Sequence, residues 1–280
     1  MAAERFRLVI MSITSTLVHR AQIRFIEPDE ALRRFVGCFW VVSAEQDATL
    51  RIVPDGSTAI SVELRDNGSS GWFLRGPLVR AEAIRFAAPA SLVGVRLRPG
   101  VAFILSGLAA HAIVGRRVGL RQFGGCQRLV SDEPDERQPA QYVARLQRFL
   151  LERLENASVN AVVAKALIEI EGGDGCVRVG EIARRCGVSS RHLNRLMRDW
   201  VGYGAKRFGR IARFQATLEQ IDEFPGRSAA AIASDTGYFD QAHMTQDLAR
   251  LAGATPGDLA SNCVADFSKT RCATSPKLRL

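Results

Sequence analysis

The chain has 280 residues, more than the roughly 150 residues of a typical domain, and this length predicts two domains. Hydrophobic residues make up 47% and charged residues 24%, a globular balance that excludes a fibre or a long disordered chain. The 38 Lys and Arg against 29 Asp and Glu give a net charge of +9, which favours nucleic acid or an anionic membrane surface as partner.

The cysteine and histidine patterns do not match those of common metal or disulfide sites. The six cysteines form no Cys-x-x-Cys pair, and the four histidines are scattered along the chain. We therefore expect reduced thiols in a cytoplasmic protein, with no metal, no cofactor and no catalytic residue. Cys38 and Cys186 are expected in the core, with a reactive thiol as the alternative for Cys38.

Residues 1–20 are expected to form an N-terminal extension. The apolar stretch 8–18 resembles the hydrophobic part of a signal peptide, but four Ser and Thr residues interrupt it and no small-x-small cleavage site follows. It is also too short to cross a bilayer, so we expect neither export nor membrane insertion. Met1 and Met11 are both candidates for the true start of the chain.

Residues 21–130 have the pattern of a β-rich domain. Short runs rich in Val, Ile, Phe and Trp alternate with turn signals containing Gly, Pro and Asn. The expected strands are residues 35–42, 49–53, 58–64, 71–74, 83–87 and 91–97. This pattern predicts a small antiparallel sandwich or barrel, followed by a helix over residues 101–110. Its aromatic residues Trp40, Trp72 and Phe73 either fill the core or line an effector cavity.

Residues 131–175 are expected to hold a linker and two helices. The linker, residues 131–139, contains two prolines and five charged residues. Apolar residues then recur at helical spacing over 142–154 and again over 159–170. The first stripe is typical of a helix that packs on its own sheet or of one that forms a homodimer, and the sequence leaves both open.

One pattern occurs twice in the last hundred residues. Ala183 precedes Gly187 as Ala233 precedes Gly237, and a new apolar stripe begins after each glycine. A small Ala lets two helices cross closely, and Gly takes the positive φ of the corner between them. The pattern predicts two helix-turn-helix units, called here the first unit and the second unit, in a domain that spans residues 176–262.

The second helix of each unit begins after a side chain suited to cap it, Ser189 in the first unit and Asp240 in the second. These helices are the expected recognition helices. In the major groove, Arg pairs with guanine, and Asn or Gln pairs with adenine. The predicted base contacts are Ser190, Arg191, Asn194 and Arg195 in the first unit and Gln241, Ala242, Thr245 and Gln246 in the second.

The stretch between the units, residues 206–223, is expected to form one connecting helix. With a rise of about 1.5 Å per residue, this helix is roughly 25 Å long. That length holds two recognition helices near the ~34 Å repeat of the major groove. Phosphate contacts are predicted from basic residues at the end of the first recognition helix and on the connecting helix: Arg198, Lys206, Arg207 and Arg210.

Charge is distributed unequally between the two units. Residues 178–213 contain ten basic and two acidic residues, whereas residues 214–266 contain two basic and eight acidic residues. Because phosphate contacts supply much of the affinity for DNA, the first unit should bind more strongly. We expect alanine at Arg191 or Arg195 to abolish specific binding, and alanine at Gln246 only to weaken it.

At these residues the chain resembles the DNA-binding domain of the AraC/XylS family of bacterial transcription regulators. The matching text is EIARRCGVSSRHLNRLMRDWVGYGAKRFGRIARFQATL, then PGRS, then AAIASDTGYFDQAHMTQDLARLAGATPGDL. The resemblance implies that both recognition helices enter the major groove of double-stranded DNA. Asp247 and Ala249 depart from the neutral or basic residues of the family pattern, and Leu248 replaces an aromatic residue.

The N-terminal half resembles the β-rich, cupin-like sensor or dimerisation domains fused to such regulators, over residues 20–125. This resemblance implies a small-molecule effector. We predict an α+β chain of two domains with a disordered tail at 263–280. The predicted function is that of a sequence-specific transcription regulator that is not an enzyme. RNA polymerase is a further candidate partner. The alternatives are a non-specific architectural DNA-binding protein and an N-terminal domain with cupin or thiol-transfer activity. The sequence leaves activator or repressor open.

Overall fold

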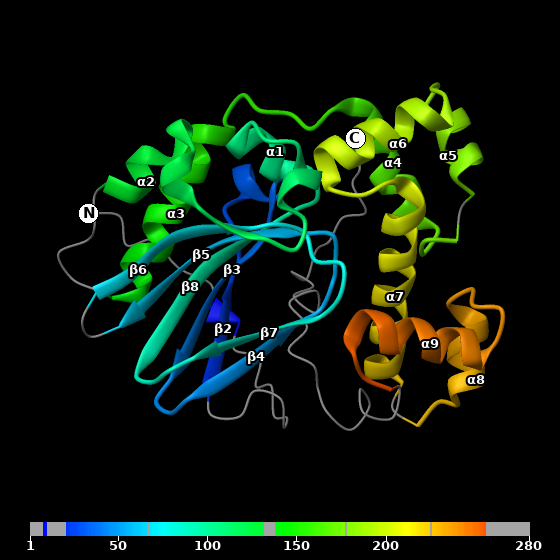
Figure 1. Cartoon of the computed structure of the whole chain (residues 1–280), viewed down its shortest axis with the longest axis horizontal. Coiled ribbons are helices and arrows are strands. Elements are labelled where there is room, and N and C mark those ends of the chain that lie inside the picture. The colour runs from blue at the N-terminus through cyan, green and yellow to red at the C-terminus, as the bar shows by residue number, and fades with distance from the viewer. Residues whose placement is uncertain are drawn as a thin grey trace.

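The computed structural model describes residues 8–9, 21–65, 68–131, 138–176, 178–224 and 226–255. Within them a β-rich N-terminal domain lies beside a helical C-terminal domain (Figure 1). Both candidate start residues, most of the N-terminal extension, most of the predicted linker and the predicted tail lie outside the described residues. Within these ranges, none of the helices is long and apolar enough to cross a membrane.

The N-terminal domain contains two antiparallel sheets. The larger one has the strand order β1-β2-β3-β8-β5-β6-β9, and β4 pairs with β7 in the smaller one. The strands are β1 Leu8–Val9, β2 Ala21–Ile26, β3 Val36–Ala44, β4 Ala48–Ile52, β5 Thr58–Arg65, β6 Gly68–Arg75, β7 Glu82–Phe86, β8 Ala90–Leu97 and β9 Arg117–Gly119. All six predicted strands are confirmed. The prediction missed β2, which pairs with β3 along its whole length, and the short edge strands β1 and β9.

Alternate residues of the larger sheet enter two different cores. Phe39 and Val41 of β3 face a core shared with helices, whereas Cys38 and Trp40 face the smaller sheet. The helices are α1 Val101–Ser106, α2 Gln127–Ser131 and α3 Pro139–Leu154, and Figure 1 shows them over one face of the larger sheet. The domain is therefore a sheet covered by helices on one face and by β4 and β7 on the other.

Helix α3 settles the alternative left open for the 142–154 stripe. Its apolar residues, from Tyr142 to Leu154, are buried in the core that it shares with β3 and β8. The stripe therefore packs on the protein's own sheet. The predicted 101–110 helix is shorter than expected, because Gly107 takes a φ of 69° after Ser106 and ends α1. A 3-10 turn, η2, follows at Ala110–Ile113.

The C-terminal domain consists of six helices in the described ranges. They are α4 Ala161–Gly172, α5 Val179–Arg185, α6 Ser190–Val201, α7 Ala205–Glu223, α8 Ala229–Asp235 and α9 Gln241–Ala252. One core joins α4, α5, α6 and the first part of α7, and another joins the last part of α7 to α8 and α9. The predicted connecting helix is confirmed as α7. Helix α4, placed with the linker region on sequence, shares the core of the first unit.

The thiols and aromatic residues singled out on sequence lie in different places. Cys38 is buried, as expected, whereas Cys186 is only half-buried beside the core of the first unit. Trp40 and Trp72 are buried on opposite faces of the larger sheet. Phe73 is half-buried, with the Arg117 guanidinium 3.6 Å from the centre of its ring. Core packing therefore accounts for Trp72.

Candidate nucleic-acid interface

The two helix-turn-helix units have the same local construction. Gly187 and Gly237 each take a φ of 70° at the corner between the paired helices, a conformation that disfavours any residue with a Cβ. The Ser189 hydroxyl accepts a hydrogen bond from the backbone N–H of His192 at 3.2 Å. The Asp240 carboxylate accepts one from the backbone N–H of His243 at 2.7 Å. Both predicted caps are confirmed, and each fixes the start of a recognition helix.

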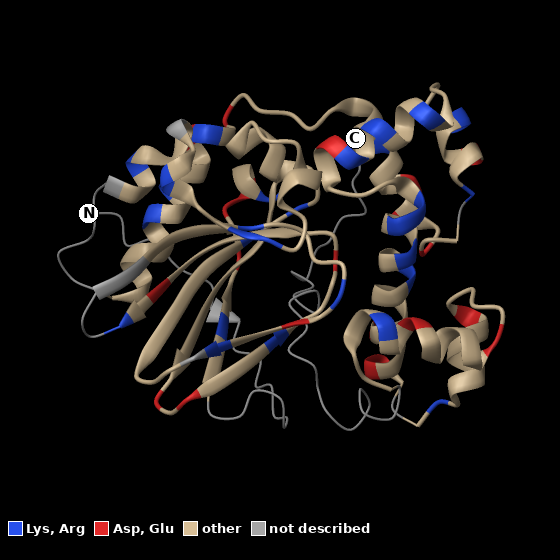
Figure 2. Cartoon of the chain, viewed as in Figure 1, with Lys and Arg blue, Asp and Glu red and all other residues tan. Residues whose placement is uncertain are grey.

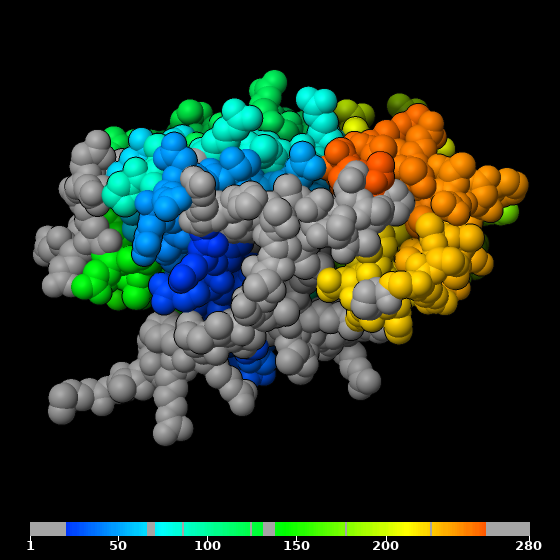
Figure 3. All heavy atoms as spheres, turned by 90° about the horizontal axis from the view of Figure 1, so that it is seen from below, coloured from blue at the N-terminus to red at the C-terminus, as the bar shows by residue number. Residues whose placement is uncertain are grey.

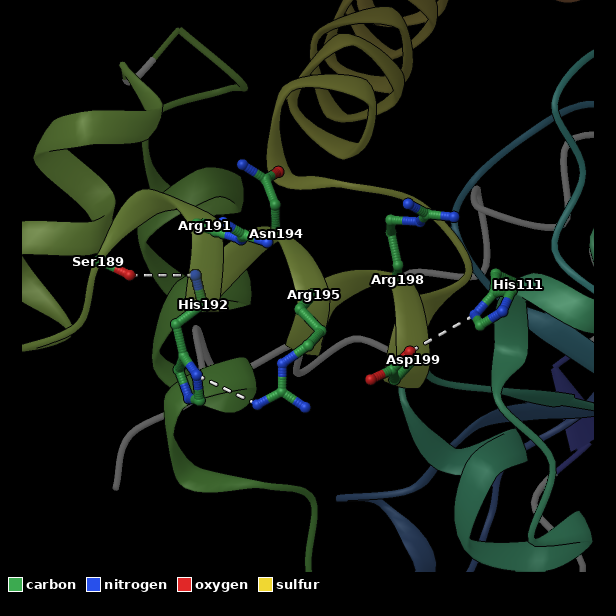
Figure 4. A pocket seen from close by; sticks show the side chains of 8 residues that line it. All are labelled: His111, Ser189, Arg191, His192, Asn194, Arg195, Arg198 and Asp199. Atoms are coloured by element: carbon green, nitrogen blue, oxygen red, sulfur yellow. Dashed lines mark hydrogen bonds and ion pairs between the residues drawn. The ribbon is translucent and has the colours of Figure 1, made fainter.

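The recognition helix of the first unit, α6, borders an open hollow of about 660 Å³ (Figure 4). Arg191, Arg195 and Arg198 are exposed and line this hollow. The Arg195 guanidinium lies 3.2 Å from a ring nitrogen of His192. Ser190, also predicted to contact a base, is exposed at the first position of α6. The face therefore offers three guanidinium groups to an anionic ligand.

Asn194 differs from the other predicted base contacts because its amide is engaged within the protein. Its Nδ2 donates to the carbonyl oxygen of Ser190 at 2.9 Å. Its Oδ1 accepts from the backbone N–H of Ala205 at 3.1 Å. Ala205 is the first residue of α7, and the residue before it, Gly204, has no side chain to cap that helix. Asn194 therefore caps the connecting helix from α6.

The recognition helix of the second unit, α9, presents uncharged side chains. Gln241, Ala242 and Gln246 are exposed, whereas Thr245 is half-buried and donates from its Oγ1 to the carbonyl oxygen of Gln241 at 2.9 Å. Amide side chains at two of these positions can pair with base edges but carry no charge for phosphate. The second unit is equipped for contact with bases more than for attraction to the DNA backbone.

An ion pair inside the domain accounts for the departure from the family pattern at Asp247. The side chain of Asp247 is 5% exposed, and both of its carboxylate oxygens bind Arg210 of α7. The Arg210 Nη2 lies 2.6 Å from Oδ1, and its Nε lies 3.0 Å from Oδ2. The predicted phosphate contact at Arg210 is therefore joined to α9 by two charge-assisted hydrogen bonds.

Several other basic residues of the first unit are also paired. Arg184 and Arg185 both donate to Glu181 of their own helix, and Arg185 reaches Glu169 of α4 at 2.7 Å. The hydrogen bonds from Arg184 and then from Arg185 lower the pKa of Glu181 to about 2. The sequence count of charges thus overstated the positive charge available to DNA, because Glu169 lay outside the window that was counted.

The exposed positive charge still lies on the first unit and the connecting helix. Figure 2 shows basic residues along α6 and the adjoining part of α7, and acidic residues around α8 and α9. Lys206 and Arg207, two of the predicted phosphate contacts, are exposed near the start of α7. In the second unit, Arg227 is ion-paired with Asp235. The folded chain thus has the predicted difference in positive charge between the two units.

The N-terminal domain touches the far end of α6, which no sequence pattern indicated. His111 of η2 lies 3.5 Å from a carboxylate oxygen of Asp199 and forms one end of the hollow (Figure 4). The rings of Phe103 and Trp200 stand 4.5 Å apart between their centres. The paired residues are 88 and 97 positions apart in sequence, so only the folded chain brings them together.

Family models match both domains of the chain. Residues 182–262 match a helix-turn-helix domain, and residues 24–119 match a domain of unknown function, DUF6597. Residues 182–262 form an AraC-type helix-turn-helix DNA-binding domain. The matched region contains both recognition helices and the connecting helix. No curated protein matches the chain in sequence.

Solved structures similar to this chain include those of ToxT from Vibrio cholerae. Apo ToxT of strain SCE256, a substituted form, is 9% identical with a TM-score of 0.40, and the match covers 80% of this chain and 96% of that one. ToxT in another crystal form is 10% identical with a TM-score of 0.41, covering 77% and 97%. Wild-type ToxT bound to an unsaturated fatty acid is 10% identical with a TM-score of 0.40, covering 80% and 94%.

The described residues contain no group of three or more His, Cys, Asp or Glu side chains that could hold a metal ion. The interface rests instead on guanidinium, amide and hydroxyl groups on two capped helices. Such groups bind phosphate oxygens and base edges.

Proposed function

We propose that this protein binds double-stranded DNA in a sequence-specific manner, with α6 and α9 in adjacent segments of the major groove. The observation that carries the proposal is the pair of capped recognition helices joined by the single helix α7. Exposed Arg and Gln side chains lie on the faces of α6 and α9 that point away from their cores. These are the side chains that pair with guanine and adenine.

The two units would contribute to DNA binding in different ways. Arg191, Arg195 and Arg198 supply charge on α6, and Lys206 and Arg207 extend it onto α7. Release of counterions by such contacts gives affinity that falls steeply with salt. Gln241 and Gln246 add base contacts with little electrostatic attraction. The first unit therefore anchors the protein, and the second adds sequence discrimination.

We also infer that the N-terminal domain senses a small molecule at a hollow in its side. The hollow measures about 40 Å³, room for a few water molecules, so a ligand would have to widen it. Trp40, Thr58 and Arg96 are among the residues that line it. The Thr58 hydroxyl is buried and has no hydrogen-bond partner. An unsatisfied buried hydroxyl costs about 1–3 kcal/mol, and a ligand that bonds to it removes that cost.

The loops that line the hollow also contact the DNA-binding domain. Its lining includes residues between β4 and β5 and residues that follow β6. Pro54, between β4 and β5, accepts a hydrogen bond from Gln215 of α7. The nearby Val53 packs into the core of the second unit. A ligand that favours one arrangement of these loops would shift the arrangement of the DNA-binding domain.

The DNA proposal is tested by selecting bound sites from a pool of random duplexes with the full chain at near-physiological salt. We expect enrichment of two short blocks about one helical turn apart, which is roughly 10 base pairs. Binding without enrichment would contradict the proposal and support an architectural DNA-binding protein. A single enriched block would show that only one unit contacts bases.

The effector proposal is tested with Thr58→Val, which replaces the hydroxyl by a methyl group of similar shape. The probe is a protein-free metabolite extract, and the measurement is the change that it causes in affinity for the selected duplex. We expect the wild-type protein to respond and the variant to respond less. The matched control is the same change at Thr49, an exposed residue of β4 that does not line the hollow. An equal response in Thr58→Val and wild type would contradict the assignment of the hollow.

A further inference from the structure

We infer that the segment between β6 and β7, residues 76–81, sets the distance between the two recognition helices and so the spacing of the DNA blocks that the protein accepts. This inference rests on the proposed function. The segment belongs to the N-terminal domain, yet it contacts the C-terminal ends of both α6 and α9. Its role would be positioning, since it acts through those helices and need not touch DNA.

The contact with the first unit lies just after α6. Gly202 ends that helix with a φ of 101°, and a Cβ placed there would stand only 2.9 Å from the ring of Pro77. The next residue, Tyr203, is buried, and its hydroxyl donates to the carbonyl oxygen of Leu78 at 3.3 Å. Val79 packs against the same core. Three consecutive residues of the segment thus hold the end of the first recognition helix.

The contact with the second unit lies at the end of α9. The backbone N–H of Ala81 donates to the carbonyl oxygen of Leu251 at 2.7 Å. Ala81 also packs beside the core of the second unit. Arg51 of β4 reaches the next carbonyl oxygen, that of Ala252, at 3.5 Å. Figure 3 shows the atoms of this unit, in orange, against those of the N-terminal domain, in blue to cyan.

The segment is itself fixed to the N-terminal domain. The backbone N–H of Gly76 donates to the carbonyl oxygen of Arg116, and that of Gly115 donates to the carbonyl oxygen of Pro77, both at 2.9 Å. Leu78 is buried. A short segment that is buried over residues 76–78 and held by two hydrogen bonds resists displacement, so its two ends keep a constant separation.

This arrangement gives the two units a second connection besides α7. The 19 residues of α7 make a helix about 28 Å long, whose first part packs in the core of the first unit and whose last part packs in the core of the second. Joined by α7 alone, the units could still change their separation if this helix bent between the two cores. The 76–81 segment closes a ring through both units, because it is bonded to the residue after α6 and to the end of α9. This second connection restrains changes in the separation of the two units.

A fixed separation has a direct consequence for DNA binding. Each added base pair moves the second block by about 3.4 Å along the axis and turns it by roughly 35° around it. A rigid pair of recognition helices can follow only one spacing well, whereas a flexible pair accepts several. The spacing preference of the full chain should therefore depend on the 76–81 segment.

The test compares Ala81→Pro with Ala81→Ser. Proline lacks the N–H that bonds to Leu251, whereas serine keeps it and changes the side chain little. The full chain is titrated with the selected duplex and with duplexes whose spacer is shorter or longer by one or two base pairs. We expect the wild type and Ala81→Ser to lose about tenfold or more in affinity at a two-base-pair change, and Ala81→Pro to lose less than about threefold.

Tyr203→Phe serves as the second variant, because it removes the hydroxyl that bonds to Leu78 from the other end of the ring without a backbone change. Circular dichroism and thermal unfolding check that each variant is folded. We expect Tyr203→Phe to broaden the spacing preference in the same direction. Unchanged spacing profiles in both folded variants would overturn the inference.

A second measurement needs no DNA and separates this inference from the proposed function. Spin labels are attached at Arg184→Cys on α5 and Ala230→Cys on α8, both exposed, after replacement of the native cysteines Cys176, Cys186, Cys263 and Cys272 by serine. We expect one narrow distance distribution in the parent protein and a broader one after Ala81→Pro. Equal widths would overturn the inference. If no duplex is enriched in the selection, the proposed function fails, and the distance distributions still decide the role of the segment.

Discussion

The first and second helix-turn-helix units have matching corner glycines, capping side chains and buried apolar stripes, but they use their charged residues differently. In the first unit, Arg191 and Arg198 are exposed beside an open hollow. In the second unit, Asp247 faces inward and binds Arg210 of α7. A shared backbone geometry thus supports an electrostatic anchor in one unit and an uncharged recognition face in the other.

A charged residue on a recognition helix is therefore not by itself evidence of contact with DNA. Asp247 would repel phosphate if it were exposed, but its carboxylate is buried and paired. Arg210 would attract phosphate, but its guanidinium is bound to that carboxylate. The pair joins the connecting helix to the second unit. The role of such a charged residue depends on the residue with which it is paired in the folded chain.

The largest effect is expected at this pair. Arg210→Ala leaves the Asp247 carboxylate buried without its partner and should lower the free energy of unfolding by about 3 kcal/mol. Arg207→Ala, on the same helix but exposed, should change it by less than about 0.5 kcal/mol while weakening DNA binding. Urea unfolding of the two variants measures both values. Similar losses of stability in the two would contradict the distinct roles given to these arginines.

A smaller effect is expected at Asn194. Asn194→Ala removes the cap of α7 and should lower the free energy of unfolding by about 1 kcal/mol, without changing which bases are preferred. Chemical denaturation gives the stability, and site selection gives the base preference. Arg191→Ala is the matched control on the same helix, for which we expect the reverse: little loss of stability and loss of the base preference. A changed preference in Asn194→Ala would restore this residue to the base contacts predicted from sequence.

The electrostatic difference between the units should appear in the salt dependence of binding. Arg198→Ala removes one exposed charge of α6 and should make the slope of log affinity against log salt shallower by about 0.9 if it neutralises one phosphate. Arg250→Ala removes an exposed charge near the end of α9 and should change the slope less. Titrations at four or more salt concentrations measure both slopes. A larger change for Arg250→Ala would reverse the assignment of the anchor.

The smallest effect concerns the exposed pairs on α5. The pKa of Glu181 is about 2 in the folded chain, below its usual value of 4.5, because Arg184 and Arg185 bond to it. Its contribution to stability is therefore present above pH 4.5 and is lost as the pH falls toward 2. Glu181→Gln should reduce the drop in melting temperature between pH 6 and pH 3. Glu155→Gln, at an exposed carboxyl elsewhere in the chain, is the control, and an equal reduction there would contradict the assignment.

Much of the fold could be predicted because its signals are local. Gly187 and Ser189 lie within a few residues of the corner and the helix start that they determine. The six predicted strands were marked in the same way, by apolar runs between turn residues. Strand β2 was missed, although its apolar residues alternate with the exposed Gln22 and Arg24 as residues of a strand do.

The parts of the site that sequence could not supply depend on long-range contacts. Asn194 has the composition of a base contact, and only the fold places the N–H of Ala205 against it. Arg210 and Asp247 are on different helices, so neither spacing nor local charge indicates the pair. Counting charges in a window also fails where the partner, such as Glu169 for Arg185, lies outside it.

The claim that the first unit anchors the protein is tested most directly by titrating one selected duplex with Arg195→Ala and Gln246→Ala side by side. Both residues are exposed on the recognition helices, so neither change should unfold the chain. We predict that Arg195→Ala abolishes specific binding, a loss of about 1–3 kcal/mol or more, while Gln246→Ala weakens it by clearly less. Equal losses in the two variants would contradict the unequal roles of the two units.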